Sequence, residues 1–396
     1  MAHETRPRLE DRRYYNGVRS VATTICCSAL ALATVSVQLL ATTANTIPIF
    51  PALQQWTLAL NNALTAQPGF YGDRGYFPIE GNRLVAYDLV AGNQLWLVPS
   101  QPLWPLVAGD ALVFVVYDDA IVALKTADGS EAWRFALNDR LAVRPVADDR
   151  QLVAATISGA VLALRIADGA VMWRGDAGAR ISALPALTAD RVYLPLEDRR
   201  VLALQAEDGA VIWERRLGGP GTGILALEDR VYVGATDNFL YCLGARQGEI
   251  SWRWRTGADV IGAPVVADNR LYFVALDNIL RSLDRHGGSQ KWKRALPLRP
   301  RGSPLLAGSI VVVGGLTPSV RGYTVATGAP AGDLTLPADL AAPPHLFWNG
   351  GIPMLVAVTT DLVKGATVIG FIPGAGLPTP FAPLPNPPTA PALTFP

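Results

Sequence analysis

Short apolar runs separated by polar turn residues recur along most of this chain. Residues 253–292 show one such unit. It has apolar runs at Val260–Val266, Leu271–Ala275 and Ile279–Leu283, followed by a short run that ends at Trp292. The breaks between the runs carry Asp, Asn and Gly, which tolerate positive φ or bond to their own backbone. Runs this short at this spacing predict four β-strands per unit and argue against alternating strands and helices.

The unit repeats along the chain, and tryptophan marks its end. The segments Ile121–Gly129, Val161–Gly169 and Val201–Gly209 each carry Ala-Leu and then Asp-Gly, with Trp four residues after the Gly. The successive tryptophans are Trp56, Trp96, Trp133, Trp173, Trp213, Trp252 and Trp292, with spacings of 40, 37, 40, 40, 39 and 40 residues. A last copy has Gly332 where Trp would fall. We interpret these tryptophans as structural residues that pack neighbouring units together, because an indole offers a large flat apolar surface.

Counting the units predicts a closed ring. Seven units lie between residues 57 and 332, and an eighth set of strands follows at His345–Trp348, Pro353–Thr359 and Ala366–Ile372 without a terminal Trp strand. An orphan strand, Leu53–Leu58, precedes the first unit. A four-stranded blade cannot bury both faces alone, and unpaired strand edges are a liability. The sequence therefore predicts an all-β fold, an eight-bladed β-propeller of four-stranded blades in which the N-terminal strand closes the last blade.

The N-terminal segment predicts export. Residues 1–19 are polar and Arg-rich, and no charged residue occurs from Ser20 to Gly72. The stretch Val21–Ala44 is about as long as a membrane-spanning helix requires. Arg before an apolar stretch places the N-terminus in the cytoplasm and the rest across the membrane. We predict a signal or anchor segment at residues 1–44 and a periplasmic or other extracytoplasmic location. Three fates of this segment stay open: cleavage after Ala44, retention as a transmembrane anchor, and lipidation at Cys26 or Cys27.

The remaining boundaries follow from composition. Residues 45–372 form the predicted propeller. Residues 373–396 contain nine Pro and no charge, which predicts an extended or disordered tail.

The composition predicts a large buried core, since 50% of the chain is apolar and 17% is charged. The net charge of +1 gives no nucleic-acid footprint. Three Cys residues make no disulfide framework, and Cys242 is expected to fill core.

The repeat resembles the pyrroloquinoline-quinone (PQQ) repeat over residues 53–372. The resemblance implies one of two branches. Quinoprotein dehydrogenases are larger and bind PQQ with calcium, using a catalytic Asp and often a vicinal disulfide. Here the adjacent pair Cys26–Cys27 lies in the export segment, and repeats of 37–40 residues leave no room for a lid. The second branch is the non-enzymatic, BamB-like one, which consists of a single exported eight-bladed ring.

We therefore expect a protein-interaction scaffold of the cell envelope, with no catalytic residue, no metal site and no cofactor. Its expected partners are envelope proteins, with the outer-membrane β-barrel assembly machinery as the specific candidate. Two alternatives stay open: a PQQ-binding dehydrogenase-like protein and an anchored ligand sensor. The three histidines, His3, His286 and His345, are expected to be solvated or locally bonded rather than metal ligands.

The loops after the tryptophan strands supply the candidate interaction residues. In the PQQ-repeat family these loops lie on the face over the central channel. Several carry arginine here, namely Arg140, Arg180, Arg215, Arg216, Arg299 and Arg301. A ring of Arg could bind an acidic protein segment. The alternative is a set of solvated charges balanced by nearby acids such as Asp139 and Asp176.

Overall fold

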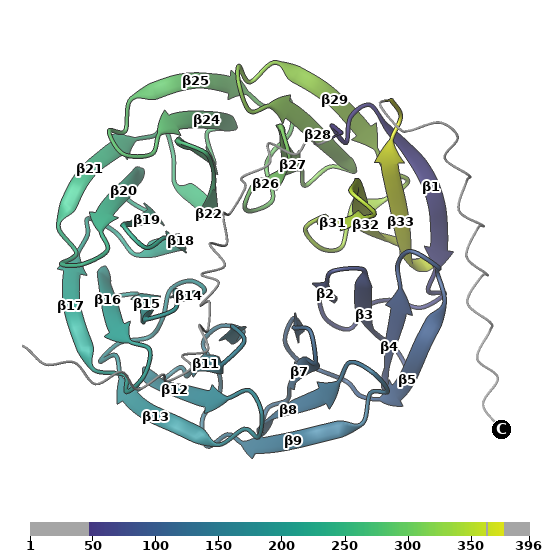
Figure 1. Ribbon diagram of the computed structural model, residues 1–396, viewed down its shortest axis with the longest axis horizontal. Helices are drawn as coiled ribbons and strands as arrows, with labels where there is room; N and C mark the ends of the chain where they lie inside the picture. The colour runs from purple at the N-terminus through teal and green to yellow at the C-terminus, as the bar shows by residue number, and fades with distance from the viewer. Residues whose placement is uncertain (1–46, 362, 376–396) are drawn as a thin grey trace, which may run out of the picture. The chain divides into compact units, whose positions relative to one another are not determined.

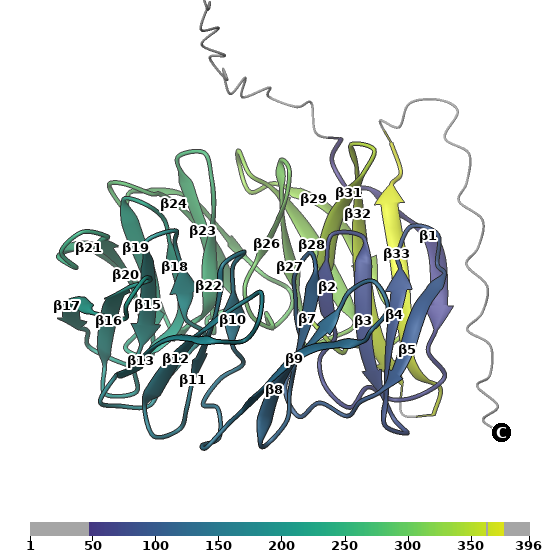
Figure 2. The ribbon, with the colours of Figure 1, turned by 60° about the horizontal axis from the view of Figure 1, so that its bottom comes forward.

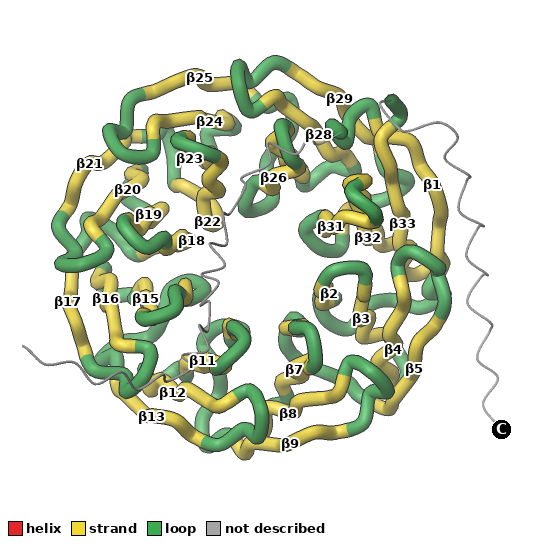
Figure 3. The backbone as a smooth tube through the Cα atoms, viewed as in Figure 1, coloured by secondary structure: helices red, strands yellow, loops and turns green. Residues whose placement is uncertain are grey.

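The computed structural model describes residues 47–361 and 363–375, and these residues form strands, turns and loops without a helix (Figures 1 and 3). The strands assemble into eight separate antiparallel sheets arranged around a common axis. In seven of these sheets the strands follow chain order from the axis to the rim. The predicted fold class is confirmed.

We number the sheets as blades 1 to 8 in chain order. Blades 1 to 4 have four strands each. Blade 1 contains β2 (Gly69–Tyr71), β3 (Arg74–Ile79), β4 (Arg83–Asp88) and β5 (Gln94–Pro99). Blade 2 contains β6 (Val107–Ala108), β7 (Leu112–Val116), β8 (Ala120–Lys125) and β9 (Glu131–Ala136). Blade 3 contains β10 (Val146–Ala147), β11 (Gln151–Ala155), β12 (Ala160–Arg165) and β13 (Val171–Asp176). Blade 4 contains β14 (Ala186–Leu187), β15 (Arg191–Pro195), β16 (Arg200–Gln205) and β17 (Val211–Arg216).

Blades 5 to 7 also have four strands, and blade 8 has five. Blade 5 contains β18 (Gly221–Ala226), β19 (Arg230–Ala235), β20 (Phe239–Gly244) and β21 (Ile250–Arg255). Blade 6 contains β22 (Val260–Ala267), β23 (Arg270–Ala275), β24 (Ile279–Asp284) and β25 (Gln290–Ala295). Blade 7 contains β26 (Leu305–Ala307), β27 (Ile310–Gly314), β28 (Ser319–Thr324) and β29 (Pro330–Thr335). Blade 8 contains β30 (Asp339–Leu340), β31 (His345–Asn349), β32 (Ile352–Asp361), β33 (Gly365–Pro373) and β1 (Ala52–Ala59).

Blade 8 joins the two ends of the ring, as the orphan strand predicted. Strand β1 pairs antiparallel with β33, with Trp56 opposite Gly370 and Leu58 opposite Val368. In Figure 1 the purple β1 lies beside the yellow β33 at the rim. The blade has a fifth strand because its innermost strand is split into β30 and β31, which both pair with β32. The predicted closure is confirmed.

The terminal tryptophans bind each blade to the next one. The indole of Trp173 in blade 3 is 6% exposed, and its Nε1 donates to Ala206 O in blade 4 at 2.8 Å. Trp96, Trp133, Trp213 and Trp292 donate to the equivalent carbonyl of the following blade. Buried indoles thus gain both packing area and a satisfied N–H.

Each of these five indoles packs against a glycine turn of the following blade, and in blades 2 to 4 this turn is Asp-Gly. Gly209 has φ +74°, and a Cβ on it would lie 2.5 Å from Trp173 Cε3. Glycine is therefore required twice, for its backbone conformation and for the closeness of the ring. The preceding Asp208 accepts the backbone N–H of Ala210 at 2.9 Å, which holds the turn. The Asp-Gly pair and the Trp of the repeat are two halves of one contact between blades.

Blade 7 lacks a terminal Trp, and a residue from the N-terminal segment takes its place. Phe50, which precedes β1, is 4% exposed. A Cβ at Gly322 would lie 2.4 Å from the Phe50 ring, and a Cβ at Gly332 would lie 2.7 Å from it. The aromatic group that the repeat omits at position 332 is thus supplied from a distant part of the chain. Closure of the ring uses this side chain as well as the pairing of β1.

Two predicted segments lie outside the described residues. They are the signal or anchor segment at residues 1–44 and most of the Pro-rich tail, from residue 376 onward. Within the described part of the chain, no helix is long and apolar enough to cross a membrane. The predictions for both segments stay predictions.

We expect Gly209→Ala to destabilise the protein by about 2–4 kcal/mol, because the methyl group meets the Trp173 indole and the backbone is left-handed. Gly350→Ala is the matched control: it also has positive φ, +55°, but nothing lies within 4 Å of the added atom. It should cost about 1 kcal/mol. Urea unfolding of both variants measures the difference, and equal losses would show that the indole contact contributes nothing.

Phe50→Ala should cost about 3–5 kcal/mol, as expected for emptying a buried aromatic site. Leu53→Ala changes a neighbouring residue that is 56% exposed, and should stay within about 0.5 kcal/mol of the wild type. The midpoints of thermal unfolding compare the two. A Phe50→Ala protein as stable as the Leu53→Ala protein would contradict the role assigned to this ring.

Candidate functional site

The loops between blades and the turns between second and third strands meet at one face of the ring, which we call the loop face (Figure 2). Backbone bonds hold each loop on both sides. Leu137 N donates to Asp119 O of blade 2 at 2.7 Å, and Ile157 N of blade 3 donates to Arg140 O at 2.8 Å. The next loop repeats this, through Ala177 and Arg180. The loop face is therefore an ordered surface rather than a set of free loops.

Three of the six candidate arginines occupy the same position in different loops. The carbonyl groups of Arg140, Arg180 and Arg299 each accept a backbone N–H from the following blade. Arg140 Nε lies 3.6 Å from Asp118 Oδ1, and its side chain is 72% exposed. Arg180 Nε lies 3.5 Å from Glu197 Oε1, with 45% of its side chain exposed. Exposed pairs of this kind contribute little stability and leave the guanidinium accessible.

The other three candidates are held differently. Arg215 and Arg216 belong to the outermost strand β17 and not to the loop after it; Arg215 Nε donates to Gly248 O of blade 5 at 2.5 Å. Arg301 donates to Leu340 O and so joins blade 7 to blade 8. The structure thus brings Arg140 and Arg180 into adjacent loops, and it does not gather all six arginines at one place.

Asp139 and Asp176, which the sequence suggested as counter-ions of the arginines, instead bind backbone N–H groups. Asp139 accepts backbone N–H groups from Arg140 at 2.8 Å and Ser158 at 3.1 Å. Hydrogen bonds from Ser158 hold the pKa of Asp139 below its ordinary value. Asp176 accepts Gly178 N at 2.8 Å. Both carboxylates shape the loops, while Asp118 and Glu197 face the arginines.

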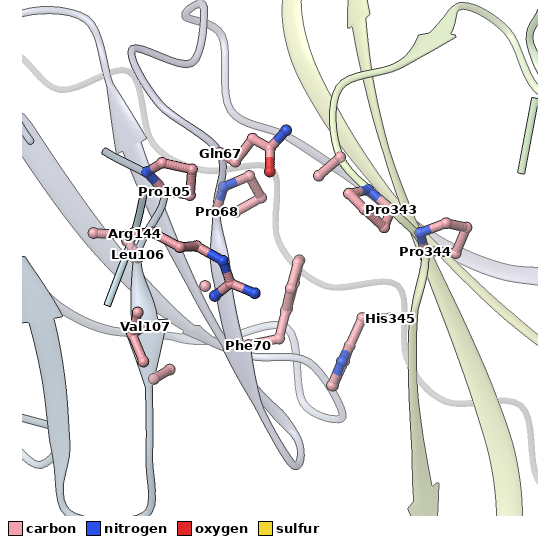
Figure 4. Close-up of a pocket in the computed structure, with 13 residues that line it drawn as sticks. Gln67, Pro68, Phe70, Pro105, Leu106, Val107, Arg144, Pro343, Pro344 and His345 are labelled. Carbon is pink, nitrogen blue, oxygen red and sulfur yellow. The ribbon is translucent and has the colours of Figure 1, made fainter. Parts of the chain in front are cut away.

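A cavity of about 280 Å³ lies at the innermost strands of the ring (Figure 4). Four blades contribute to it, through Gln67–Phe70 of blade 1, Pro105–Ala108 of blade 2, Arg144 of blade 3 and Ala342–His345 of blade 8. We call this cavity the axial pocket. Most of its lining residues are proline or other apolar residues, with a single charged side chain and no acid, although the surface exposed to the cavity is more polar than apolar.

Arg144 is the charged residue of the axial pocket. It precedes β10, is partly buried, and points into the space between the other lining residues in Figure 4. No acid neutralises it among the described residues, and no hydrogen bond to its guanidinium is found there. Burial alone lowers the pKa of Arg144. The site therefore holds a partly desolvated cation without a counter-ion.

His345 forms a flat wall of the same pocket with Phe70. The two rings stack with centroids 4.7 Å apart and planes 9° apart. His345 Nε2 lies 2.8 Å from Gly72 O, which accepts, so Nε2 carries the proton. Burial lowers the pKa of His345, which favours the neutral imidazole. The expectation of a locally bonded histidine is confirmed for His345, and His286 likewise bonds Asn269 through Nδ1 at 2.7 Å.

Arg144 was not among the residues predicted from the sequence, although its position in the repeat distinguishes it from the equivalent residues of other units. In most units a proline lies just before or within the innermost strand, and the residue before that proline varies. The residues before proline are Gln67, Trp104, Arg144, Leu184, Ala263, Ser303 and Pro343. Arg144 is the one charge in that column. Aligning the units on proline would have singled it out.

The calcium ion implied by the dehydrogenase branch does not fit these residues. Calcium needs several carboxylate or amide oxygens around it. No cluster of three His, Cys, Asp or Glu side chains that could hold a metal occurs in residues 47–361 and 363–375. The axial pocket contributes no carboxylate at all.

A ring of eight blades, in which a tryptophan of one blade packs against a glycine turn of the next at six of the junctions, is a propeller of PQQ-like repeats. The chain belongs to the family described as outer membrane protein assembly factor BamB, whose model matches residues 53–139, 80–226 and 218–342. Among curated protein sequences, none matches this chain significantly.

Solved structures share the fold at low sequence identity. BamB from Moraxella catarrhalis is 17% identical with a TM-score of 0.65, over 81% of this chain and 99% of that one. Quinohemoprotein alcohol dehydrogenase from Comamonas testosteroni is 12% identical with a TM-score of 0.64, over 85% and 78%. Sqt1 from Saccharomyces cerevisiae is 9% identical with a TM-score of 0.69, over 81% and 99%. Proteins with different names share this ring, so these likenesses show the fold alone.

The lowered pKa of His345 predicts a pH dependence of stability. Below about pH 6.5 the unfolded chain binds a proton at this residue that the folded protein binds less readily, so stability falls as pH drops. His345→Gln should reduce the loss measured by urea unfolding between about pH 7.5 and about pH 5.5. Asn349→Gln, in the same strand β31, changes no titratable group, is the control and should leave the loss unchanged. An imidazole NMR titration that places the His345 midpoint above its ordinary value would contradict the prediction.

Proposed function

We propose that this protein is a non-catalytic interaction scaffold of the cell envelope that takes part in outer-membrane β-barrel protein assembly. The observation that carries this proposal is the match of the BamB family model to three overlapping segments between residues 53 and 342. The likeness to BamB from Moraxella catarrhalis agrees with it, since the aligned region takes in 99% of that chain. The propeller therefore matches nearly the whole of that protein.

The structure supports a docking role for the loop face. Its loops are bonded to the blades on both sides, so a partner would lose little loop entropy on binding. Arg140 and Arg180 stand in adjacent loops with exposed guanidinium groups. Arginine is well suited to interfaces because its planar fork pairs with carboxylates and its charge is weakly hydrated. We propose that these two residues contact an acidic segment of a partner protein.

The proposed location is the periplasm, with export directed by residues 1–44. The basis is the Arg-rich start followed by the apolar stretch Val21–Ala44. The proposal leaves membrane attachment through this segment, or its removal, to be decided by the size and N-terminus of the mature protein. A dehydrogenase-like role is the alternative, and quinone titration of the purified protein tests it.

The scaffold proposal is tested by site-specific photo-crosslinking in intact cells. A photoreactive amino acid at position 140 or 180 should capture outer-membrane barrel-assembly proteins, identified by mass spectrometry. Position 165 is the control, because Arg165 is also exposed and paired, with Asp168 at 2.9 Å, but lies at a turn of the opposite face. Barrel-assembly proteins captured equally from position 165, or from none of the three, would overturn the docking surface.

Charge reversal adds a second measurement. The double variant Arg140→Glu/Arg180→Glu should lower recovery of the same partners by about tenfold, because the introduced carboxylates repel an acidic partner segment. Its unfolding free energy should stay within about 1 kcal/mol of the wild type, because both ion pairs are exposed. Arg134→Glu/Arg165→Glu removes two other exposed pairs and should leave recovery unchanged. Equal recovery with both double variants would contradict a role for the loop-face arginines.

A further inference from the structure

The axial pocket presents a feature that the scaffold role does not use. Arg144 is the one charged side chain among the 13 residues lining it. Partial burial of a cation costs free energy unless a partner compensates for it. The guanidinium has no counter-ion in the part of the chain that the structure describes. An anion that binds beside this guanidinium would therefore form an ion pair stronger than one on the exposed surface.

The neighbouring groups define the shape of that anion. The stacked rings of Phe70 and His345 form a flat wall, and Pro105, Pro343 and Pro344 provide other apolar surfaces. His345 is neutral with its Nε2 proton engaged by Gly72 O, so it adds no second positive charge. Gln67 places its amide at the rim of the pocket in Figure 4, where it can donate a further hydrogen bond. One cation, one amide, a flat aromatic wall and an otherwise partly polar lining suit a singly charged ligand with a small apolar body.

Arginine selects the charged group of the ligand. Its planar fork pairs with a carboxylate through two parallel hydrogen bonds, and such pairs are stronger when partly desolvated. A cavity of about 280 Å³ lies at the small end of ligand sites, so the occupant is small. We propose that the axial pocket binds the carboxylate of a small organic acid, with Arg144 as its counter-ion and the Phe70–His345 wall against its apolar body. This inference does not rest on the proposed scaffold function.

Titration of the full-length protein in mild detergent with three small acids tests the proposal. The probes are benzoate, cyclohexanecarboxylate and acetate, with benzyl alcohol as the uncharged analogue of benzoate. We expect benzoate to bind with a dissociation constant of about 1 mM or below, measured by saturation-transfer NMR. Binding should also shift the imidazole signals of His345, which reports contact inside the pocket. Benzyl alcohol should bind at least about tenfold more weakly.

Variants connect the binding to Arg144. Arg144→Gln keeps much of the side-chain size and removes the charge, and should weaken benzoate binding by about tenfold or more. Arg144→Lys keeps the charge without the fork and should give an intermediate affinity. Arg140→Gln, on the loop face, is the matched control and should leave the affinity within about twofold. Thermal unfolding of each variant establishes that the ring remains intact.

Three outcomes would overturn the proposal. The first is that none of the three acids binds at about 20 mM, an affinity too weak for a built site. The second is equal affinity of benzoate for the wild type and an intact Arg144→Gln protein. The third is equal binding of benzoate and benzyl alcohol, which would reveal an apolar cavity without a role for the cation. The photo-crosslinking experiment is read independently, so failure of either proposal leaves the other unaffected.

Discussion

Six of the indoles that end a blade lie against a glycine of the following blade, and this repeated contact holds neighbouring sheets together in one ring. A single blade has two apolar faces and too few residues to form a core of its own. Trp173 covers the Asp-Gly turn of blade 4 and donates its N–H to Ala206 O at 2.8 Å. The same arrangement recurs in most blades, so the packing geometry between neighbours is set by one repeated contact. Because both partners must fit, the glycine and the tryptophan belong to one structural unit although they lie in different blades.

The repeat is interrupted where the ring closes, and the interruption shows how closure works. Blade 7 has Gly332 in place of tryptophan, and Phe50 fills the space. Strand β1 follows immediately and becomes the rim strand of blade 8 by pairing with β33. Trp56 does not repeat the usual bond, since its Nε1 has no partner among the described residues. The N-terminal part of the ring thus contributes to two blades at once, which ties the first residues of the fold to the last.

The contacts that hold the ring together lie between blades, so the residues of the loops and of the innermost strands can differ among proteins with this fold. BamB, a quinohemoprotein alcohol dehydrogenase and Sqt1 all share the ring with this chain at 9–17% identity. Function must therefore lie in what the blades carry, namely the loop face and the innermost strands. In this protein the loop face carries exposed arginines in adjacent loops. The innermost strands carry Arg144 in a pocket without an acid.

The sequence by itself determined the fold almost completely. The regular spacing of tryptophans, the Asp, Asn and Gly turns and the orphan strand at Leu53–Leu58 were enough to predict the eight blades and their closure, because each blade forms from residues adjacent in the chain. The split of the inner strand of blade 8 and the substitution of Phe50 for a tryptophan were not predictable. Both depend on how distant segments meet once the ring has closed.

The candidate site was decided by the tertiary structure. The six arginines share a sequence context, but strand ends shifted by one or two residues separate Arg215 and Arg216 from the loops that hold Arg140 and Arg180. The axial pocket joins Phe70, Arg144 and His345, which come from blades 1, 3 and 8. Local patterns specify strands and turns because those depend on neighbours in the chain. Which inner-strand side chains share one cavity depends on the order of blades around the axis, and only the closed ring brings these three together.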